Sequence, residues 1–202
     1  MTLPHRIEAA EGADIERLKA DTIKGPTILL YSGNYFSFER PQDCHWELED
    51  IAHGLAMTCR FAGQARRYYS VAEHSVYVSQ LVPPELAWDA LMHDAAEAFI
   101  CDMAKPLKVM LPDYKVVEQR VEKAIAERYR LIDPMPREIK LADIQMLRAE
   151  QVQIMRNNDD WEWTFDVPEP DIRIAALGPY EAKALFLDRA AALRAKESSD
   201  GK

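Results

Sequence analysis

A histidine and a carboxylate stand side by side in the segment LMHDAAEAFICD, where His93 precedes Asp94. The spacing predicts a helix here, and Glu97, four residues after His93 and three after Asp94, then lies on the same side of it. Burying two carboxylates in an otherwise apolar helix is costly unless they gain a partner, and a divalent cation is one such partner. The segment is therefore a candidate metal centre.

Two more polar residues stand alone in apolar helical stretches. His74 lies in SVAEHSVYVSQ, and Asp143 lies in KLADIQML. Two imidazoles and two carboxylates form a mixed nitrogen and oxygen ligand set suited to Mn, Co, Fe, Zn or Mg, with positions left for water and substrate. Taken singly, each residue is more often an ordinary core or surface residue than a ligand, so the argument depends on all four together.

In the order His74, His93-Asp94, Asp143 the chain resembles the HD-domain phosphohydrolases, whose ligands follow the pattern H...HD...D on successive helices. The segments YSVAEHSVYVS, LMHDAAEAFICDMAKPLK and LADIQML look similar to the bacterial 5′-deoxynucleotidases and to the dATP triphosphohydrolases of that superfamily. The likeness runs from about residue 50 to about residue 150, roughly half of the chain.

The resemblance implies roles for residues beyond the ligands. Glu97 and Asp102 match positions that help to orient the attacking water and the substrate, and Lys108 matches a lysine near the phosphate. The pair Arg60-Phe61 resembles an Arg-aromatic pair that contacts the nucleotide, with a spacing to the first ligand histidine one residue shorter than in the monophosphate nucleotidases. The resemblance also implies a homodimer or a higher homo-oligomer.

The histidines bear on how many metal ions to expect. They are His5, His45, His53, His74 and His93, so none follows the His-Asp pair. Cyclic-nucleotide phosphodiesterases related to the superfamily use further downstream histidines for a second ion. We therefore expect one divalent ion per subunit.

The expected reaction is hydrolysis of a deoxynucleotide at the bond between phosphorus and the 5′ oxygen. The cation would lower the pKa of a coordinated water, which Glu97 would orient or deprotonate. Arg60 and Lys108 would offset charge on the phosphate oxygens. The same centre would serve a 5′-nucleotidase or a dNTP triphosphohydrolase, and the sequence does not decide between them.

Two alternatives stay open at this point. A non-catalytic protein would use the same metal site to sense or sequester nucleotides, and it would bind them without turnover. An all-helical scaffold without any metal would instead require the four candidate ligands to find other partners inside apolar helices. Retention of Glu97 and Asp102 beside the ligands favours catalysis over binding alone.

Helical spacing dominates the elements that must position these residues. The segment TILLYSGNYFSFERP alternates β-branched and aromatic residues around Ser32-Gly33-Asn34, which predicts a β-hairpin. We expect an all-α HD-domain helical bundle over 46–197, an N-terminal extension with this hairpin over 1–45, packed on the main domain, and a flexible tail over 198–202. From residue 46 onward the apolar pattern predicts long helices over 48–63, 72–82, 85–100, 113–131, 136–155 and 180–197.

Composition excludes several classes of function. The formal net charge of −9 argues against a nucleic-acid polymer as partner, because such binding depends on neutralising phosphates with Lys and Arg. A small anionic substrate would need a local positive pocket. The N-terminus has no export signal and the chain has no apolar run of the roughly 20 residues that a bilayer span needs, so we expect a cytoplasmic protein without a membrane partner.

Overall fold

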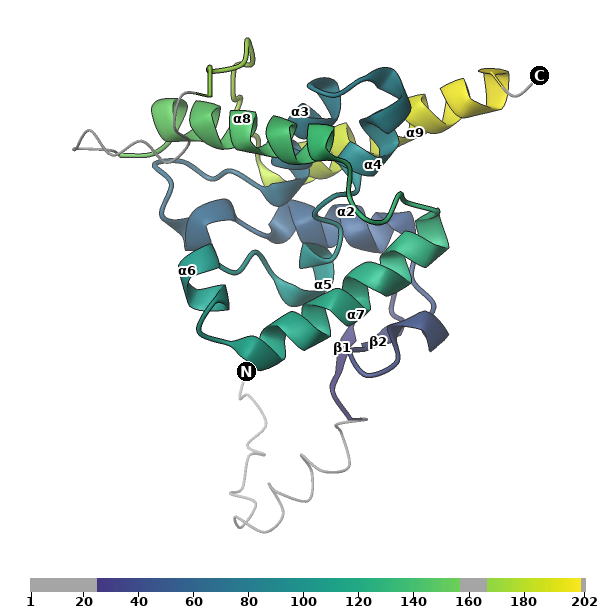
Figure 1. Cartoon of the computed structure of the whole chain (residues 1–202). Helices are drawn as coiled ribbons and strands as arrows, with labels where there is room; N and C mark the ends of the chain where they lie inside the picture. Colours follow the sequence, from purple (N-terminus) through teal and green to yellow (C-terminus); the bar gives the residue numbers. More distant parts are fainter. Residues whose placement is uncertain (1–24, 157–166, 201–202) are drawn as a thin grey trace, which may run out of the picture.

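The computed structural model describes residues 25–156 and 167–200 of the chain, which form eight α-helices and a small two-stranded sheet (Figure 1). The predicted all-α architecture with an N-terminal hairpin is confirmed at this level, while the first 24 residues of the expected extension lie outside the described ranges. None of the described helices has the length and apolar character needed to cross a bilayer. The helices are α2 (Leu48–Met57), α3 (Val71–Gln80), α4 (Ala87–Leu91), α5 (Glu97–Ile100), α6 (Lys105–Lys108), α7 (Pro112–Tyr129), α8 (Arg137–Gln153) and α9 (Pro179–Asp200), with short 3-10 helices η1 (Pro41–Asp43), η2 (Arg60–Gly63) and η3 (Pro84–Leu86).

The hairpin forms where the alternating pattern predicts it. Strands β1 (Thr27–Leu29) and β2 (Tyr35–Ser37) pair antiparallel, with Ile28 opposite Phe36. Gly33 has a φ of 86° in the connecting turn, a left-handed conformation that glycine adopts without a steric penalty. The predicted hairpin is therefore confirmed.

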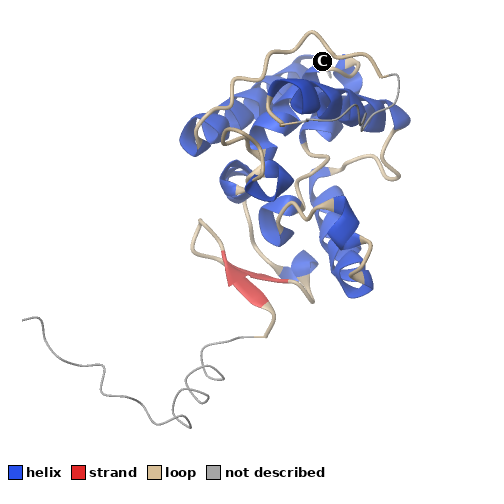
Figure 2. Cartoon of the chain, turned by 90° about the vertical axis from the view of Figure 1, so that its left-hand side faces the viewer, coloured by secondary structure: helices blue, strands red, loops and turns tan. Residues whose placement is uncertain are grey.

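The hairpin lies at one end of the helices and is tied to them by packing and hydrogen bonding (Figure 2). Phe36 is fully buried, and its ring stacks on Phe99 of α5 with centroids 4.1 Å apart. The buried carboxylate of Asp50 accepts hydrogen bonds from the backbone N–H of Ser32 in the turn and of Glu47 at the start of α2. The hairpin thus shares the main core.

Two groups of buried side chains flank α3. The first joins the hairpin, α2, α5, α7 and α9, with Leu55 and Phe186 among its fully buried members. The second lies mainly between α3 and α8 and contains Ile139 and Met146. Helix α9 packs along α2 and α3, and α8 packs on α3. Helix α3 is consequently covered on several sides, which explains why residues 71–76 are all buried.

The helix predicted over 48–63 is shorter in the structure, where α2 ends at Met57. Helix α2 ends at Met57, after which Thr58 and Cys59 are extended and Cys59 forms a β-bridge with Ser70. Phe61 then has a left-handed φ of 57° within η2. The competing bridge breaks the helix before residue 63, and the break frees Arg60 to turn away from the α2 axis.

The predicted helix over 85–100 is also wrong as one continuous element. Helix α4 ends at Leu91, residues 92–96 form turns, and α5 begins at Glu97. Hydrogen bonds in the turns span three residues, as from Ala95 N–H to Met92 O and from Glu97 N–H to Asp94 O. Consecutive residues of a regular α-helix point about 100° apart. The irregular backbone here lets His93 and Asp94 face the same point.

We predict that Gly54→Ala destabilises the fold, although alanine favours an isolated helix by about 1 kcal/mol relative to glycine. A Cβ at this position of α2 would lie 2.6 Å from the carbonyl oxygen of Ala98 and 2.8 Å from its Cβ, where α2 meets α5. Urea denaturation should show a loss of about 1–3 kcal/mol, whereas the exposed control Met57→Ala should change the unfolding free energy by less than about 1 kcal/mol. A more stable Gly54→Ala protein would contradict the close packing.

Candidate metal centre

His74 lies in the middle of α3 with its side chain fully buried. Its Nδ1 is 2.7 Å from Oε1 of Glu150 on α8. Burial alone would raise the pKa of Glu150, but the charges of Arg60 and His74 outweigh burial and lower this pKa. An ionised carboxylate can only accept a hydrogen bond, so Nδ1 is the donor. The hydrogen bond fixes the ring so that Nε2 points away from Glu150, toward the candidate ligands.

His93 is oriented in the same manner by the backbone. Its Nδ1 lies 2.8 Å from the carbonyl oxygen of Ala90, which again can only accept. In an uninterrupted helix that carbonyl would accept from the N–H of Asp94 four residues later. The break after α4 therefore supplies both the turn that positions His93 and the acceptor that fixes its ring.

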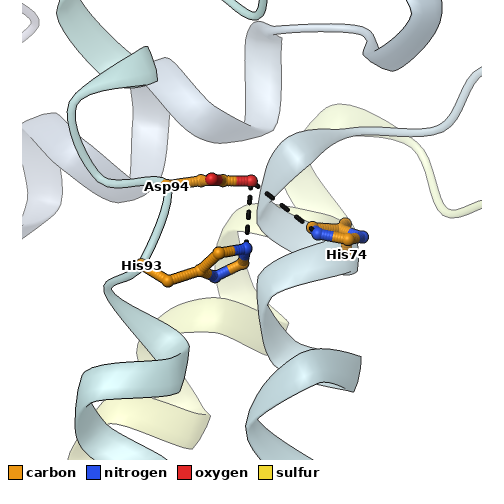
Figure 3. Close-up of side chains that lie close together, drawn as sticks. All are labelled: His74, His93 and Asp94. Atoms are coloured by element: carbon orange, nitrogen blue, oxygen red, sulfur yellow. Dashed lines mark ion pairs between the residues drawn. The ribbon is translucent and has the colours of Figure 1, made fainter. Parts of the chain in front are cut away.

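The two imidazoles converge on one carboxylate, as Figure 3 shows. Oδ2 of Asp94 lies 3.2 Å from Nε2 of His93 and 3.7 Å from Nε2 of His74. Both Nε2 atoms are buried, and neither makes a hydrogen bond within the described part of the chain. Their neighbours are carboxylate oxygens, and a cation between the two nitrogens and these oxygens would be bound by all of them. These three side chains form a group that could hold a metal ion.

Asp143 lies beside this group. Its Oδ1 is 3.2 Å from Nε2 of His74, and its side chain is 44% exposed. The structure thus brings all four predicted ligands together around the imidazole of His74. Coordination by Asp143 as the fourth ligand stays a prediction, because the compact ligand group contains only His74, His93 and Asp94.

The protonation states follow from these contacts. Burial alone would raise the pKa of Asp94, but the charges of His93, His74 and Arg60 hold it below its usual range. Burial and the charge of Arg60 lower the pKa of His74, yet Glu150 and Asp143 offset them and raise it to about 9. Without a cation, the acidic groups around His74 therefore favour a proton where the ion would lie, so metal binding should displace that proton.

Arg60 contacts two carboxylates of the candidate centre. One guanidinium nitrogen lies 3.1 Å from Oε2 of Glu150 and another 3.6 Å from Oδ2 of Asp94. The side chain is only 11% exposed. Burial alone would lower the pKa of Arg60, but the carboxylates of Glu150 and Asp94 outweigh burial and raise this pKa above its usual value. The guanidinium therefore stays charged. Arg60 thus contacts the candidate ligand Asp94 and the carboxylate Glu150 that orients His74, while its contact with a nucleotide stays a prediction.

The sequence analysis missed Glu150. This residue is fully buried, and both of its oxygens are used, one by His74 and the other by Arg60. It lies seven residues after Asp143, two helical turns along the same face of α8. A second carboxylate at that spacing from a candidate ligand was the signal that could have identified it.

A second buried carboxylate was missed next to His74. Glu73 accepts hydrogen bonds from the backbone N–H of Ala175, Ala176 and Leu177 at 2.8–3.1 Å, and from the hydroxyl of Tyr77. These contacts tie the segment before α9 to α3. No local sequence pattern pairs this glutamate with a segment about a hundred residues away.

Glu97 opens α5 next to the candidate ligands. Its Oε2 is buried and has no hydrogen-bond partner in the ranges that the structure describes. Burial above all, then the charges of Asp94 and Asp102, raise the pKa of Glu97 to about 10. Asp102 is half-buried in the loop that follows α5. The carboxyl of Glu97 thus lies close enough to Asp94 and to Asp102 to feel the charge of both.

The remaining predicted substrate residues are already engaged by the protein. Nζ of Lys108 lies 2.5 Å from Oε1 of Glu118, and this contact raises the pKa of the lysine although burial alone would lower it. The ring of Phe61 lies 5.4 Å below the guanidinium carbon of Arg60. Lys108 is therefore not a free phosphate ligand, and the contact of Phe61 with a nucleotide stays a prediction.

Comparison with known proteins gives two relatives that share most of this chain. It is 38% identical over 164 residues to "Uncharacterized protein YfdR" of Escherichia coli, covering 80% of this chain and 92% of that protein. It is 32% identical over 179 residues to "Uncharacterized protein RCAP_rcc00048" of Rhodobacter capsulatus, covering 79% and 91% respectively. No protein-family model matches the chain.

We predict that Glu150→Gln weakens metal binding while the fold is retained. The amide keeps the size of the carboxylate, but its NH₂ group must face a donor of either His74 or Arg60, so one of the two contacts is lost. Loss of such a supporting carboxylate should lower Mn²⁺ affinity by about 10–100-fold in isothermal titration. The exposed control Glu138→Gln on the same helix should bind Mn²⁺ like wild type. Equal affinities for all three folded proteins would show that Glu150 does not support the site.

Proposed function

The chain belongs to the same family as YfdR and RCAP_rcc00048, and we propose that it is a metal-dependent phosphohydrolase of HD-domain type that acts on deoxynucleotides. One observation carries the proposal. The buried Nε2 atoms of His74 and His93 face one oxygen of Asp94 without hydrogen bonds in the described structure. Two imidazole nitrogens and a carboxylate oxygen that converge on one point form a mixed ligand set of the kind that binds a divalent cation.

The ligand types fit a catalytic ion better than a structural one. Two imidazoles and one carboxylate, with Asp143 as a proposed fourth ligand, leave coordination positions for water and substrate, whereas structural zinc sites are closed and rich in cysteine. When bound, a divalent ion (Mn, Co, Zn, Fe or Mg) would supply Lewis acidity toward a phosphoryl oxygen and lower the pKa of a water molecule. No described cysteine belongs to the ligand group.

Glu97 is the best placed residue to handle a proton. Its carboxyl is mostly buried, it has an unused oxygen, and its pKa is raised far above that of an exposed glutamate. A positive charge in the nearby centre would bring this pKa back toward neutral, where a general base is most effective. We propose that Glu97 orients the attacking water and accepts its proton, and that Asp102 positions the water or the sugar.

Charge balance supports a small anion rather than a polymer as the substrate. Arg60 is paired with Glu150 and Asp94, and Lys108 is paired with Glu118, so the protein supplies little uncompensated positive charge near the site. Attraction of a phosphate would therefore depend chiefly on the bound cation. Arg60 would act mainly by holding Asp94 and, through Glu150, His74.

The test is product release from a panel of deoxynucleoside mono- and triphosphates under Mn²⁺, Co²⁺ and Mg²⁺, with separate detection of phosphate and triphosphate. We expect metal-dependent turnover by wild type, a loss of at least about 100-fold in Asp94→Ala, and unchanged turnover in the exposed control Glu85→Ala. The product identifies the monophosphate or the triphosphate branch.

One outcome would favour a nucleotide sensor instead. If the metal-loaded wild type turns over none of the nucleotides, while Asp94→Ala still abolishes nucleotide binding, the site binds without catalysis and the proposed hydrolase activity is wrong.

A further inference from the structure

A cavity of about 430 Å³ lies between the turn after α4, helix α7 and the segment that joins α7 to α8, a connection that can be followed in Figure 1. Its volume lies within the range of small-molecule sites. Of the described members of the candidate metal centre, only His93 lines the cavity, and its buried ring separates the two. A ligand of this cavity would therefore be a molecule other than the substrate of the metal centre.

One part of the cavity lining is apolar and buried. It consists of Met92, Ala96, Ile125 and Ile139, which have exposed fractions of 6% or less and form what we call the apolar floor. Side chains of this kind offer dispersion contacts and apolar surface to a ligand, but no hydrogen bond. The apolar floor therefore suits a hydrocarbon chain or ring and not a hydrated inorganic ion.

The charged part of the lining, which we call the rim, consists of three carboxylates and one ammonium, those of Asp89, Glu122, Asp133 and Lys123. Oδ1 of Asp89 accepts a hydrogen bond from the N–H of Ile132 at 2.6 Å. The side chain of Lys123 is 75% exposed, and its ammonium lies 3.9 Å from Glu127, which is outside the lining. Within the described ranges, Glu122 and Asp133 have neither a hydrogen bond nor an ion pair. The rim thus carries more negative than positive charge, and two of its carboxylates are open to a ligand.

The charges around Glu122 add to this preference for a cation. Burial alone would raise the pKa of Glu122, and the charge of Glu118 on the same helix raises it further. Lys108 opposes this effect, whereas Asp133 of the rim adds to it. Negative potential therefore prevails at the carboxyl group of Glu122, and a cation beside it would be attracted.

The spacing of the rim carboxylates indicates an organic cation and not a metal ion. A divalent ion needs several ligand atoms close to one another, and the compact group of this kind in the described part of the chain is that of His74, His93 and Asp94. The rim carboxylates form no such group there. An organic ammonium requires less convergence, because it can donate to one or two carboxylates while its hydrocarbon part covers the apolar floor.

We propose that this cavity binds a small organic cation, an amine with an apolar body, whose ammonium group lies at Glu122 and Asp133 and whose hydrocarbon part packs on the apolar floor. The inference rests on the cavity and does not depend on hydrolase activity. Met92 and Ala96 belong to the turn that carries His93 and Asp94. The ligand would therefore contact the wall that positions two candidate metal ligands, although its own site is separate from theirs.

Three ligands of similar shape test the charge preference in a nuclear magnetic resonance titration of the isotope-labelled protein. At neutral pH benzylammonium is a cation, benzyl alcohol is uncharged and benzoate is an anion. The double variant Glu122→Gln/Asp133→Asn removes the proposed partners of the ammonium group. The control Asp113→Asn removes an exposed carboxylate of α7 outside the lining, and Asp94→Ala removes a candidate metal ligand. Circular dichroism establishes that each variant is folded.

We expect benzylammonium to bind wild type, Asp113→Asn and Asp94→Ala with similar affinity, and to bind the double variant about tenfold more weakly, a difference of about 1.4 kcal/mol. Wild type should bind benzyl alcohol more weakly than benzylammonium, and benzoate more weakly still. The backbone amide signals that shift should come from α7 and from residues 131–136.

The assignment is overturned if wild type binds benzylammonium no more tightly than benzoate, or if Asp113→Asn weakens the binding as much as the double variant does. Signal shifts confined to residues outside the cavity would also contradict it. Tighter binding of benzyl alcohol than of benzylammonium would identify an apolar cavity without the proposed preference for a cation, and would likewise overturn the assignment.

Discussion

The hydrogen bond between His74 and Glu150 is the contact on which the rest of the site depends. It joins α3 to α8 inside the protein, and both side chains are fully buried. Arg60 completes the arrangement by pairing with Glu150 and approaching Asp94. Removing one member of a buried, hydrogen-bonded charge group typically costs about 3–5 kcal/mol, because the partner is left uncompensated. The site and the packing of α3 on α8 are therefore coupled.

The backbone contributes as much to the centre as the side chains do. The interruption between α4 and α5 costs regular helical hydrogen bonds, yet the freed carbonyl of Ala90 orients His93, and the turn brings Asp94 beside it. The early end of α2 has a comparable effect, since it lets Arg60 reach Glu150 across the fold. In both places a locally less stable backbone is compensated by polar contacts that assemble the site.

Patterns within a few residues predicted most of the elements and selected polar residues that lie together in the structure. Alternation around Gly33 gave the hairpin, and helical spacing gave α3, α7 and α8 to within a few residues. The residues His74, His93, Asp94 and Asp143, far apart in sequence, do lie together. Periodicity alone could not show where a helix breaks, because tertiary contacts such as the bridge from Cys59 to Ser70 decide it.

The spacing on α8 could have selected Glu150 as a candidate, but it could not show which residues Glu150 contacts. Glu150 lies 76 residues from His74 and 90 from Arg60, and no local pattern joins them. Glu73 likewise accepts hydrogen bonds from a backbone segment that lies about a hundred residues away in the sequence. Arg60 was selected for a contact with substrate, but a buried ion pair gives it a structural task first. Sequence spacing indicates which groups share a helix face, whereas packing determines which groups support them.

The most direct measurement is a crystal structure of the full chain loaded with Mn²⁺, with the ion located by anomalous scattering. The account predicts one anomalous peak per subunit, with Nε2 of His74, Nε2 of His93 and a carboxylate oxygen of Asp94 at coordination distance, and with the hydrogen bond from His74 to Glu150 intact. A fully loaded crystal with the ion bound elsewhere, or with either imidazole turned away from it, would contradict the account.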